Sequence, residues 1–240
     1  MRRILVENRV AMAREAADIV ALQLNSKQDS VLGLATGETP LGLYDELVKR
    51  VKSGELSFRN VITFNLDEYV GLAPSHPQSY NFYMTKHFIS LSDLNPANAH
   101  IPNGVANDLE LECKEYDQMI AQCGGIDLQI LGIGSNGHIG FNEPSEELIV
   151  GTHVVQLTEE TRRANARFFQ DIAEVPTHAI TMGVGSILRA KKIVLLVSGE
   201  SKAPLIAKLA QGVVDTTIPV TLLHLHNDVT VIIDAQTTQL

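Results

Sequence analysis

The stretch LGIGSNGHIGFNEP, residues 131–144, has the clearest capacity for chemistry in this sequence. Glycines allow tight turns and let the backbone or a neighbouring side chain approach a ligand closely. His138 is the residue type that exchanges protons near neutral pH, and Glu143 lies near enough along the chain to orient its ring. The pattern fits an acid–base pair beside a ligand, and it also fits glycines that merely form a turn.

The same stretch contains Gly132, Gly134 and Gly137 in the G-x-G-x-x-G spacing of a dinucleotide-binding turn. Such a turn runs into a long amphipathic helix, whereas HIGFNEP follows here and Pro144 disfavours helical geometry at the residue before it. A zinc site is also disfavoured, because there is no H-E-x-x-H and His224 and His226 have no obvious carboxylate or cysteine partner. We expect neither a dinucleotide nor a metal.

Two other segments carry candidate groups. Asp67 and Glu68, in FNLDEYVG, follow an apolar strand and are either solvated loop acids or the source of a catalytic base. The segment LATGETP provides the hydroxyls of Thr36 and Thr39 and the start of a helix near Pro40, a suitable place for a phosphate or carboxylate. The P-loop spacing and its lysine are missing.

Two basic side chains could add to this anion site. Lys202, in SGESK, lies at another expected helix start, and Arg167, in ANARFF, could make a bidentate contact. Taken singly, each also fits an ordinary surface charge. The G-x-S-x-G pattern of serine hydrolases does not occur.

The elements that must position these groups alternate between strand and helix. Apolar spacing predicts a helix over 8–24, with Thr39 as N-cap and Pro40 as first residue of a second helix that ends at Gly54. Other predicted helices cover 79–90, 107–122 and 201–211, and predicted strands cover 30–35, 61–65, 127–134, 153–157, 178–182, 192–197 and 229–234. We therefore predict a single α/β domain over residues 1–240, a mostly parallel sheet covered by helices on both faces.

In such a sheet, ligands bind beyond the carboxyl ends of the strands, where loops lead into helices. The candidate groups follow expected strands that end near residues 35, 65, 132 and 197. This convergence predicts one shared site.

Composition limits the partners. The chain has 240 residues, 45% hydrophobic and 20% charged, which suits a folded protein with a substantial core. Its 19 basic and 28 acidic residues give a formal net charge of −9, which disfavours binding to nucleic acid or an anionic membrane. Two cysteines, no signal-peptide pattern in MRRILVENRV and no long apolar stretch lead us to expect a cytoplasmic protein.

Together these residues resemble the glucosamine-6-phosphate deaminase family, also called glucosamine-6-phosphate isomerase. The similarity covers nearly the whole chain, and the combination of FNLDEY with GHIGFNEP is its most specific part. The other matching segments are LATGETPLGLYDEL, HPQSYNFYM, RRANARFF, AITMGVGSIL and VSGESKAPLI. The resemblance implies a modified Rossmann-like fold, as in ribose-phosphate isomerases, and a role in amino-sugar catabolism.

The resemblance implies conversion of D-glucosamine 6-phosphate and water to D-fructose 6-phosphate and ammonia, without metal or organic cofactor. Asp67 would take the proton from C2 and return it at C1, His138 would serve ring opening, and Glu143 would orient His138. Asn136 stands where members carry aspartate or asparagine. The matching phosphate-binding positions are Thr36, Gly37, Arg167 and Lys202.

Three departures from the family pattern set further expectations. Glu38 stands in the anion loop where many relatives have a small residue, so its side chain must point away from the phosphate or affinity will suffer. Asn136 is uncharged, so the pH dependence of ring opening is expected to differ. HVVQL, in place of a basic segment, and a chain that stops at residue 240 predict weak or absent allostery and a monomer or small homo-oligomer, and residues 153–182 resemble a mobile lid.

Two alternatives stay open. A 6-phosphogluconolactonase shares the glycine-rich strand end followed by Gly-His but would hydrolyse a lactone. A sugar-phosphate sensor would bind without turnover and would carry a DNA-binding module, for which this acidic chain has no room.

Overall fold

Alternating strands and helices build an α/β fold in the computed structural model, which describes residues 1–237. The strands are β1 (Arg2–Val6), β2 (Val31–Leu34), β3 (Ile62–Asn65), β4 (Asp67–Tyr69), β5 (Ala99–His100), β6 (Leu128–Leu131), β7 (His153–Gln156), β8 (His178–Thr181), β9 (Ile193–Val197) and β10 (Val229–Asp234). The helices are α1 (Arg9–Ser26), α2 (Leu41–Lys52), α3 (Tyr80–His87), α4 (Leu109–Gln122), α5 (Glu159–Asn165), α6 (Val184–Leu188) and α7 (Ala203–Ala210). Short 3₁₀ helices are η1 (Ile89–Leu91), η2 (Pro96–Asn98), η3 (Ala166–Phe168), η4 (Ile172–Glu174), η5 (Glu200–Lys202), η6 (Pro219–Leu225) and η7 (Ala235–Thr237).

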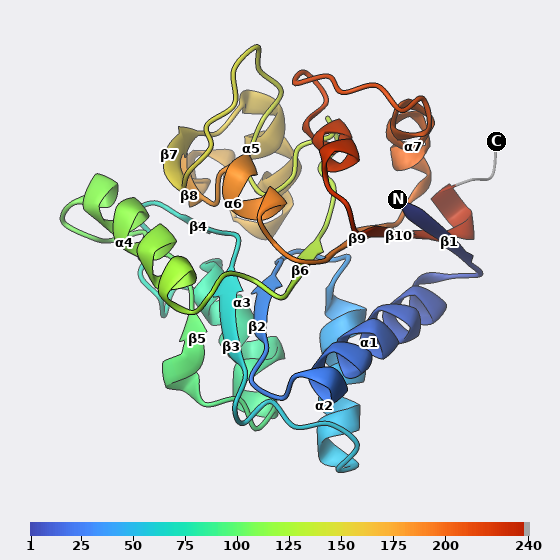
Figure 1. Cartoon of the computed structure of the whole chain (residues 1–240). Helices are drawn as coiled ribbons and strands as arrows, with labels where there is room; N and C mark the ends of the chain where they lie inside the picture. The colour runs from blue at the N-terminus through green and yellow to red at the C-terminus, as the bar shows by residue number, and fades with distance from the viewer. Residues whose placement is uncertain (238–240) are drawn as a thin grey trace.

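Seven strands form the main sheet in the order β1-β10-β9-β6-β2-β3-β5, and every neighbouring pair is parallel. Successive side chains of a strand point to opposite faces. In β9, Val194 and Leu196 pack into the core beneath α1 and α2, whereas Leu195 and Val197 pack into the core on the other face, toward α4 and α7. Figure 1 shows α1 and α2 on one side of the sheet and α7 on the other. The predicted parallel sheet with helices on both faces is confirmed.

The strands predicted at 153–157 and 178–182 are present as β7 and β8, but they lie outside the parallel sheet. β7 and β8 pair antiparallel with each other, and β8 pairs antiparallel with β4, giving a second sheet of three strands among the described residues. Asp67 and Glu68, for which a solvated loop was one interpretation, lie in strand β4, which is buried throughout. Two adjacent acids conceal this strand, because carboxylates are normally depleted from buried strands.

Strand β1 was not predicted either. It lies at the sheet edge beside β10, and most of its side chains are exposed, so it lacks the continuous apolar run of a central strand. Its pairing brings the start of α1 to the same edge of the sheet as the loops that follow β9 and β2.

Asp127, just before β6, forms hydrogen bonds to neighbouring segments at the amino edge of the main sheet, opposite the edge where the loops after β9 and β2 lie. Its buried carboxylate accepts hydrogen bonds from Lys27 Nζ at 2.6 Å, Lys191 Nζ at 2.7 Å and the Val31 amide at 2.8 Å. Burial alone would raise the pKa of Asp127, but the bonds from Lys191 and Lys27 outweigh it and hold the pKa below its usual value. The charged carboxylate therefore stabilises the fold above its unfolded pKa, and this contribution is lost as pH falls through the lower folded pKa.

We predict that Asp127→Asn lowers the free energy of unfolding by about 1.5 kcal/mol at pH 7, because neutralisation weakens charge-assisted bonds. Urea denaturation should show the difference from wild type shrinking as pH falls below ~4, where the wild-type carboxylate also becomes protonated. The exposed Asp29 provides the control, and Asp29→Asn should change little. An Asp127→Asn deficit of the same size at pH 7 and at pH 2.5 would contradict this assignment.

Candidate active site

A cavity of about 500 Å³ opens at the carboxyl edge of the main sheet, where the loops after β2, β3, β6 and β9 meet. This is the convergence that the strand ends predict. Of the candidate residues, the cavity is lined by Thr36, Gly37, Asp67, His138, Arg167 and Lys202. Asn136 and Glu143 lie behind the wall and contact His138.

Asp67 is the buried carboxyl group that lines the cavity. It is 6% exposed, and its side chain forms no hydrogen bond or ion pair within residues 1–237. Burial, with a smaller contribution from the charge of Glu68, raises the pKa of Asp67 to about 8. A carboxylate that is poorly solvated and unpaired is a strong proton acceptor once it is deprotonated.

The neighbouring acid has a different role. Glu68 accepts hydrogen bonds from the backbone amides of Tyr69 at 2.8 Å, Tyr80 at 2.9 Å and Asn81 at 2.9 Å. Its carboxylate therefore satisfies amides at the start of α3 and joins that helix to β4. Burial raises the pKa of Glu68 to about 6, and these three bonds oppose the rise. The choice between two adjacent acids, open from sequence, is decided by geometry: Glu68 holds the helix and Asp67 faces the cavity.

His138 and Glu143 form the expected pair. His138 Nδ1 lies 3.3 Å from Glu143 Oε2 without the alignment of a hydrogen bond, and this buried nitrogen has no other partner among the described residues. Asn136 donates to Glu143 Oε2 at 2.7 Å, and Thr161 donates to the other carboxylate oxygen. Burial alone would raise the pKa of Glu143, but contact with His138, Thr161 and Asn136 holds it below its usual value. Glu143 thus contacts His138 Nδ1 while Asn136 and Thr161 hold its two oxygens.

The glycines of this stretch make room for the acid–base groups. A Cβ at Gly134 would lie 2.1 Å from His138 Nε2, so the imidazole occupies the space of a missing side chain. Gly140, at φ +57°, lies beside Thr181 and Asp67, where a Cβ would be 3.6 Å from Asp67 Oδ2. The chain continues after Gly137 without a helix until α5, whereas a dinucleotide-binding turn runs directly into a long helix.

The loop of residues 35–40, here called the anion loop, joins β2 to α2. Gly37 adopts φ +100°, a conformation that favours glycine, and its carbonyl accepts a 2.6 Å hydrogen bond from the Tyr83 hydroxyl. The prediction of Thr39 as N-cap is wrong: α2 begins at Leu41, Pro40 is the N-cap, and no side chain caps the helix. Proline, already at φ −79°, starts the helix without a side-chain cap, so amides of the first turn stay available to an anion.

Arg167 and Lys202 converge on this loop from two other segments. Arg167 Nη2 lies 3.4 Å from Glu38 Oε2, and its guanidinium stacks over the ring of Phe168. The Glu38 side chain was expected to point away from the phosphate site. Its carboxylate instead pairs with Arg167, and both residues line the cavity. Burial, and then the nearby charge of Arg167, lowers the pKa of Lys202. Two cations held this close are suited to a shared anion.

Sequence reasoning missed several groups at the cavity. Thr161 contacts Glu143 from α5, which only the fold brings near. Arg9 and Ser198 also line the cavity and are joined by a hydrogen bond. Arg9 begins α1, three residues after the unpredicted strand β1 ends, so the rule that groups follow strand ends would have found it had that strand been recognised. His224 and His226, considered as metal ligands, instead contact the carbonyl oxygens of Leu209 and Ala190.

The fold and the site define a class of α/β protein in which one cavity combines a buried carboxyl group, a histidine–glutamate pair, a loop at the start of a helix and two basic side chains. The family model described as glucosamine-6-phosphate isomerases/6-phosphogluconolactonase matches residues 7–232. The chain belongs to this family.

Several relatives resemble it over their whole length. A protein of Thermoanaerobacter sp. (strain X514) named glucosamine-6-phosphate deaminase is 55% identical over 100% of this chain and 95% of its own. One of Halothermothrix orenii with the same name is 52% identical over 100% of both chains. A solved structure described as a monomeric glucosamine-6-phosphate deaminase has a TM-score of 0.95 at 47% identity, covering 99% of each chain. The 6-phosphogluconolactonase of Thermotoga maritima, at 17% identity and a TM-score of 0.76, shares the fold alone, covering 97% of this chain and 98% of its own.

We predict that Gly134→Ala lowers kcat by ~10-fold or more, because the added methyl group displaces the imidazole that transfers the proton. Inorganic phosphate should still bind normally, since the anion loop is untouched. Steady-state kinetics and calorimetric phosphate titration measure the two effects. A Gly134→Ala protein with wild-type kcat would show that the position of His138 is not critical.

We predict that Glu38→Gln tightens binding of inorganic phosphate about two- to fivefold, because it releases Arg167 from an exposed ion pair and removes a negative charge. The matched control is Glu159→Gln, which breaks a comparable exposed pair with Arg163 away from the anion loop and should leave the affinity unchanged. Calorimetry at low salt measures both. Weaker binding by Glu38→Gln would mean that Glu38 orients Arg167 productively.

Proposed function

We propose that this chain is a glucosamine-6-phosphate deaminase, which converts D-glucosamine 6-phosphate and water to D-fructose 6-phosphate and ammonia. The relatives that match over the whole chain carry this name. The observation that carries the proposal is that an unpaired buried acid, Asp67, and an oriented imidazole, His138, share one cavity with an anion loop. That set of groups suits proton transfers on a phosphorylated sugar.

The phosphate is proposed to bind where Thr36 and Gly37 of the anion loop face Lys202 and Arg167. Binding energy from this remote group would hold the reacting carbons against the acid–base groups. The sugar would extend from there toward Asp67 and His138.

Ring opening requires proton transfer to the ring oxygen, the role proposed for His138, with Glu143 stabilising the charged imidazole that alternates with the neutral form. Asp67 would then remove the C2 proton, and an enolamine forms across C1 and C2. Return of a proton to C1 leaves an imine at C2, which water hydrolyses to the ketone and ammonia. Each proton-transferring group typically contributes ~10²–10⁴-fold to the rate.

The raised pKa of Asp67 sets a condition on this step. In the free protein, an Asp67 pKa of about 8 keeps much of the carboxyl protonated at neutral pH. A substrate ammonium near Asp67 would favour the charged carboxylate and lower that pKa. Substrate binding would therefore help to generate the base.

Asn136 adds a hydrogen bond to Glu143 without adding a second negative charge near His138.

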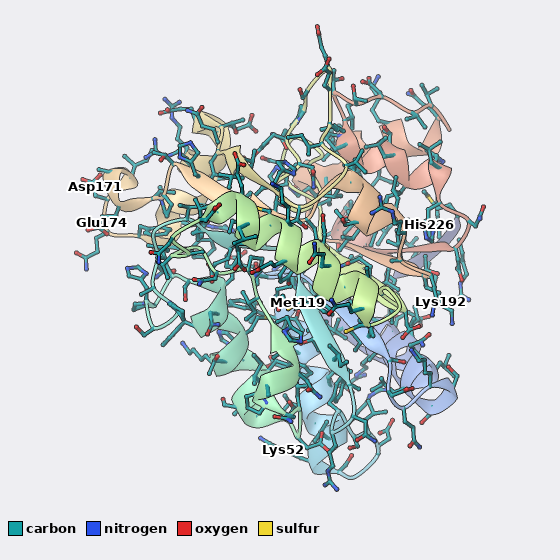
Figure 2. The ribbon with its side chains drawn as sticks, turned by 60° about the vertical axis from the view of Figure 1, so that its left-hand side comes forward. Lys52, Met119, Asp171, Glu174, Lys192 and His226 are labelled. Atoms are coloured by element: carbon teal, nitrogen blue, oxygen red, sulfur yellow. The ribbon has the colours of Figure 1, made fainter. Side chains whose placement is uncertain are left out.

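Residues 153–182 are proposed to act as a lid over the bound sugar. Their two ends are the paired strands β7 and β8, so movement would concentrate in the segment between them, which carries Thr161 and Arg167. Figure 2 shows Asp171 and Glu174 of this segment at the outer margin of the molecule.

We also propose that the chain acts as a monomer or a small homo-oligomer, as a 47% identical relative described as monomeric suggests. No helix within residues 1–237 is long and apolar enough to cross a membrane.

The proposal predicts that the purified protein releases ammonia from glucosamine 6-phosphate in step with fructose 6-phosphate. Asp67→Asn should lower kcat by ~10²-fold or more with little change in substrate affinity. The wild-type kcat/KM should rise with pH toward about 8 as the Asp67 carboxyl of the free protein loses its proton.

A stability measurement gives an independent check on Asp67. Because its folded pKa lies above its unfolded pKa, folding stability falls as pH rises between these two values, and above both the buried charge is destabilising. Asp67→Asn should therefore raise Tm at pH 9 while it abolishes most turnover.

Two outcomes would favour the alternative functions. Hydrolysis of 6-phosphogluconolactone without ammonia release would favour a lactonase, and tight hexose-phosphate binding without turnover would favour a sensor.

A further inference from the structure

Arg9, at the start of α1, is a cationic residue that lines the cavity. It is not among the site residues expected from the sequence, and the proposed mechanism gives it no role. It lines the cavity together with the anion loop and Lys202, and it forms no ion pair within residues 1–237. Its one side-chain hydrogen bond is from Nε to the hydroxyl oxygen of Ser198, at 2.7 Å. The terminal nitrogens of the guanidinium remain available as donors.

The arginine is held from behind by a buried chain of polar groups. The Ser198 hydroxyl donates its hydrogen to Asp234 Oδ2, so its oxygen faces Arg9 as an acceptor. Asp234 is fully buried, and its other oxygen accepts from the Thr237 amide at 3.2 Å and hydroxyl at 2.9 Å. Because the Ser198 hydrogen is already committed, this residue serves to position Arg9.

Helix packing places Arg9 beside the start of the anion-binding helix. A Cβ at Gly42 in α2 would lie 3.2 Å from the Ala13 side chain in α1, so the two helices touch at this point. Arg9 is four residues before Ala13, hence one turn toward the N-terminus on the same helix face. This packing, together with the bond to Ser198, places Arg9 near the first turn of α2 in the cavity that the anion loop also lines.

We propose that Arg9 is a substrate-binding residue that contacts the phosphate group of the sugar phosphate, positioned for this by Ser198 and Asp234. A planar guanidinium with its Nε fixed presents two terminal nitrogens to phosphate oxygens in fork geometry. Arg9 lines the cavity from the start of α1, whereas Arg167 lines it from the segment between β7 and β8. The identity of the sugar phosphate rests on the proposed function, whereas anion binding by Arg9 does not.

Calorimetric titration with inorganic phosphate and with fructose 6-phosphate tests the proposal on the full chain. For Arg9→Gln, both Kd values should rise roughly tenfold to a hundredfold, and the KM for glucosamine 6-phosphate should rise similarly while kcat changes less than about twofold. Arg14→Gln, an exposed change of the same charge in the same helix, is the matched control and should bind as wild type does. Tm values report on folding, and Arg9→Lys provides a milder substitution that keeps the charge but loses the fork.

If Ser198 acts by positioning Arg9, the effects of substituting the two residues on phosphate affinity should not add. Ser198→Ala should weaken phosphate binding in the wild-type background and have little further effect in Arg9→Gln, because it acts through Arg9. Unchanged phosphate affinity in Arg9→Gln, or equal weakening by Arg14→Gln, would overturn the proposal. If the wild type releases no ammonia, the proposed function fails, while the phosphate titrations still decide the role of Arg9.

Discussion

The site depends on one costly arrangement, a buried carboxyl group that has no hydrogen-bond or ion-pair partner in the part of the chain that the structure describes. Asp67 is the first residue of β4, a short edge strand of the three-stranded sheet, with Glu68 beside it and no cation or donor bound to it within residues 1–237. Burying an unpaired acid destabilises the fold, and the pairing of β4 with β8 and the contact of Glu68 with α3 are what hold it in place. The same cost makes Asp67 reactive.

Around this carboxylate, most other groups of the cavity are tightly partnered. Glu143 is contacted by His138, Asn136 and Thr161, so its charge and its orientation are both fixed. Gly134 provides the space into which the imidazole fits. Sites of this kind rest on preorganisation, in which the supporting contacts are formed before the ligand arrives. In the proposed function, the cations that line the cavity with the anion loop hold the phosphate of the substrate, at a distance from the bonds that change.

Much of the fold follows from pattern, because central strands such as β9 are apolar and the loops after parallel strands must meet at one edge. The recognised motifs likewise indicated the cavity residues. What the pattern could not show is the second sheet, since the acids of β4 hide a buried strand, and the role of β1, whose exposed edge position removes its apolar signal. The contacts of Thr161 and Arg9 depend on tertiary packing between distant segments, which no local spacing records. The absence of a side-chain cap on α2 is likewise invisible until the loop geometry is known.

The most direct test of the central claim is the fate of the hydrogen at C1. A single carboxylate on one face of the sugar must deliver the new hydrogen from one side only, whether that hydrogen comes from C2 or from solvent. Conversion of C2-deuterated substrate in H₂O, and of unlabelled substrate in D₂O, should therefore place the new hydrogen isotope at one and the same prochiral C1 position of fructose 6-phosphate, as read by NMR. Equal distribution over both C1 positions would contradict the assignment of Asp67 as the base.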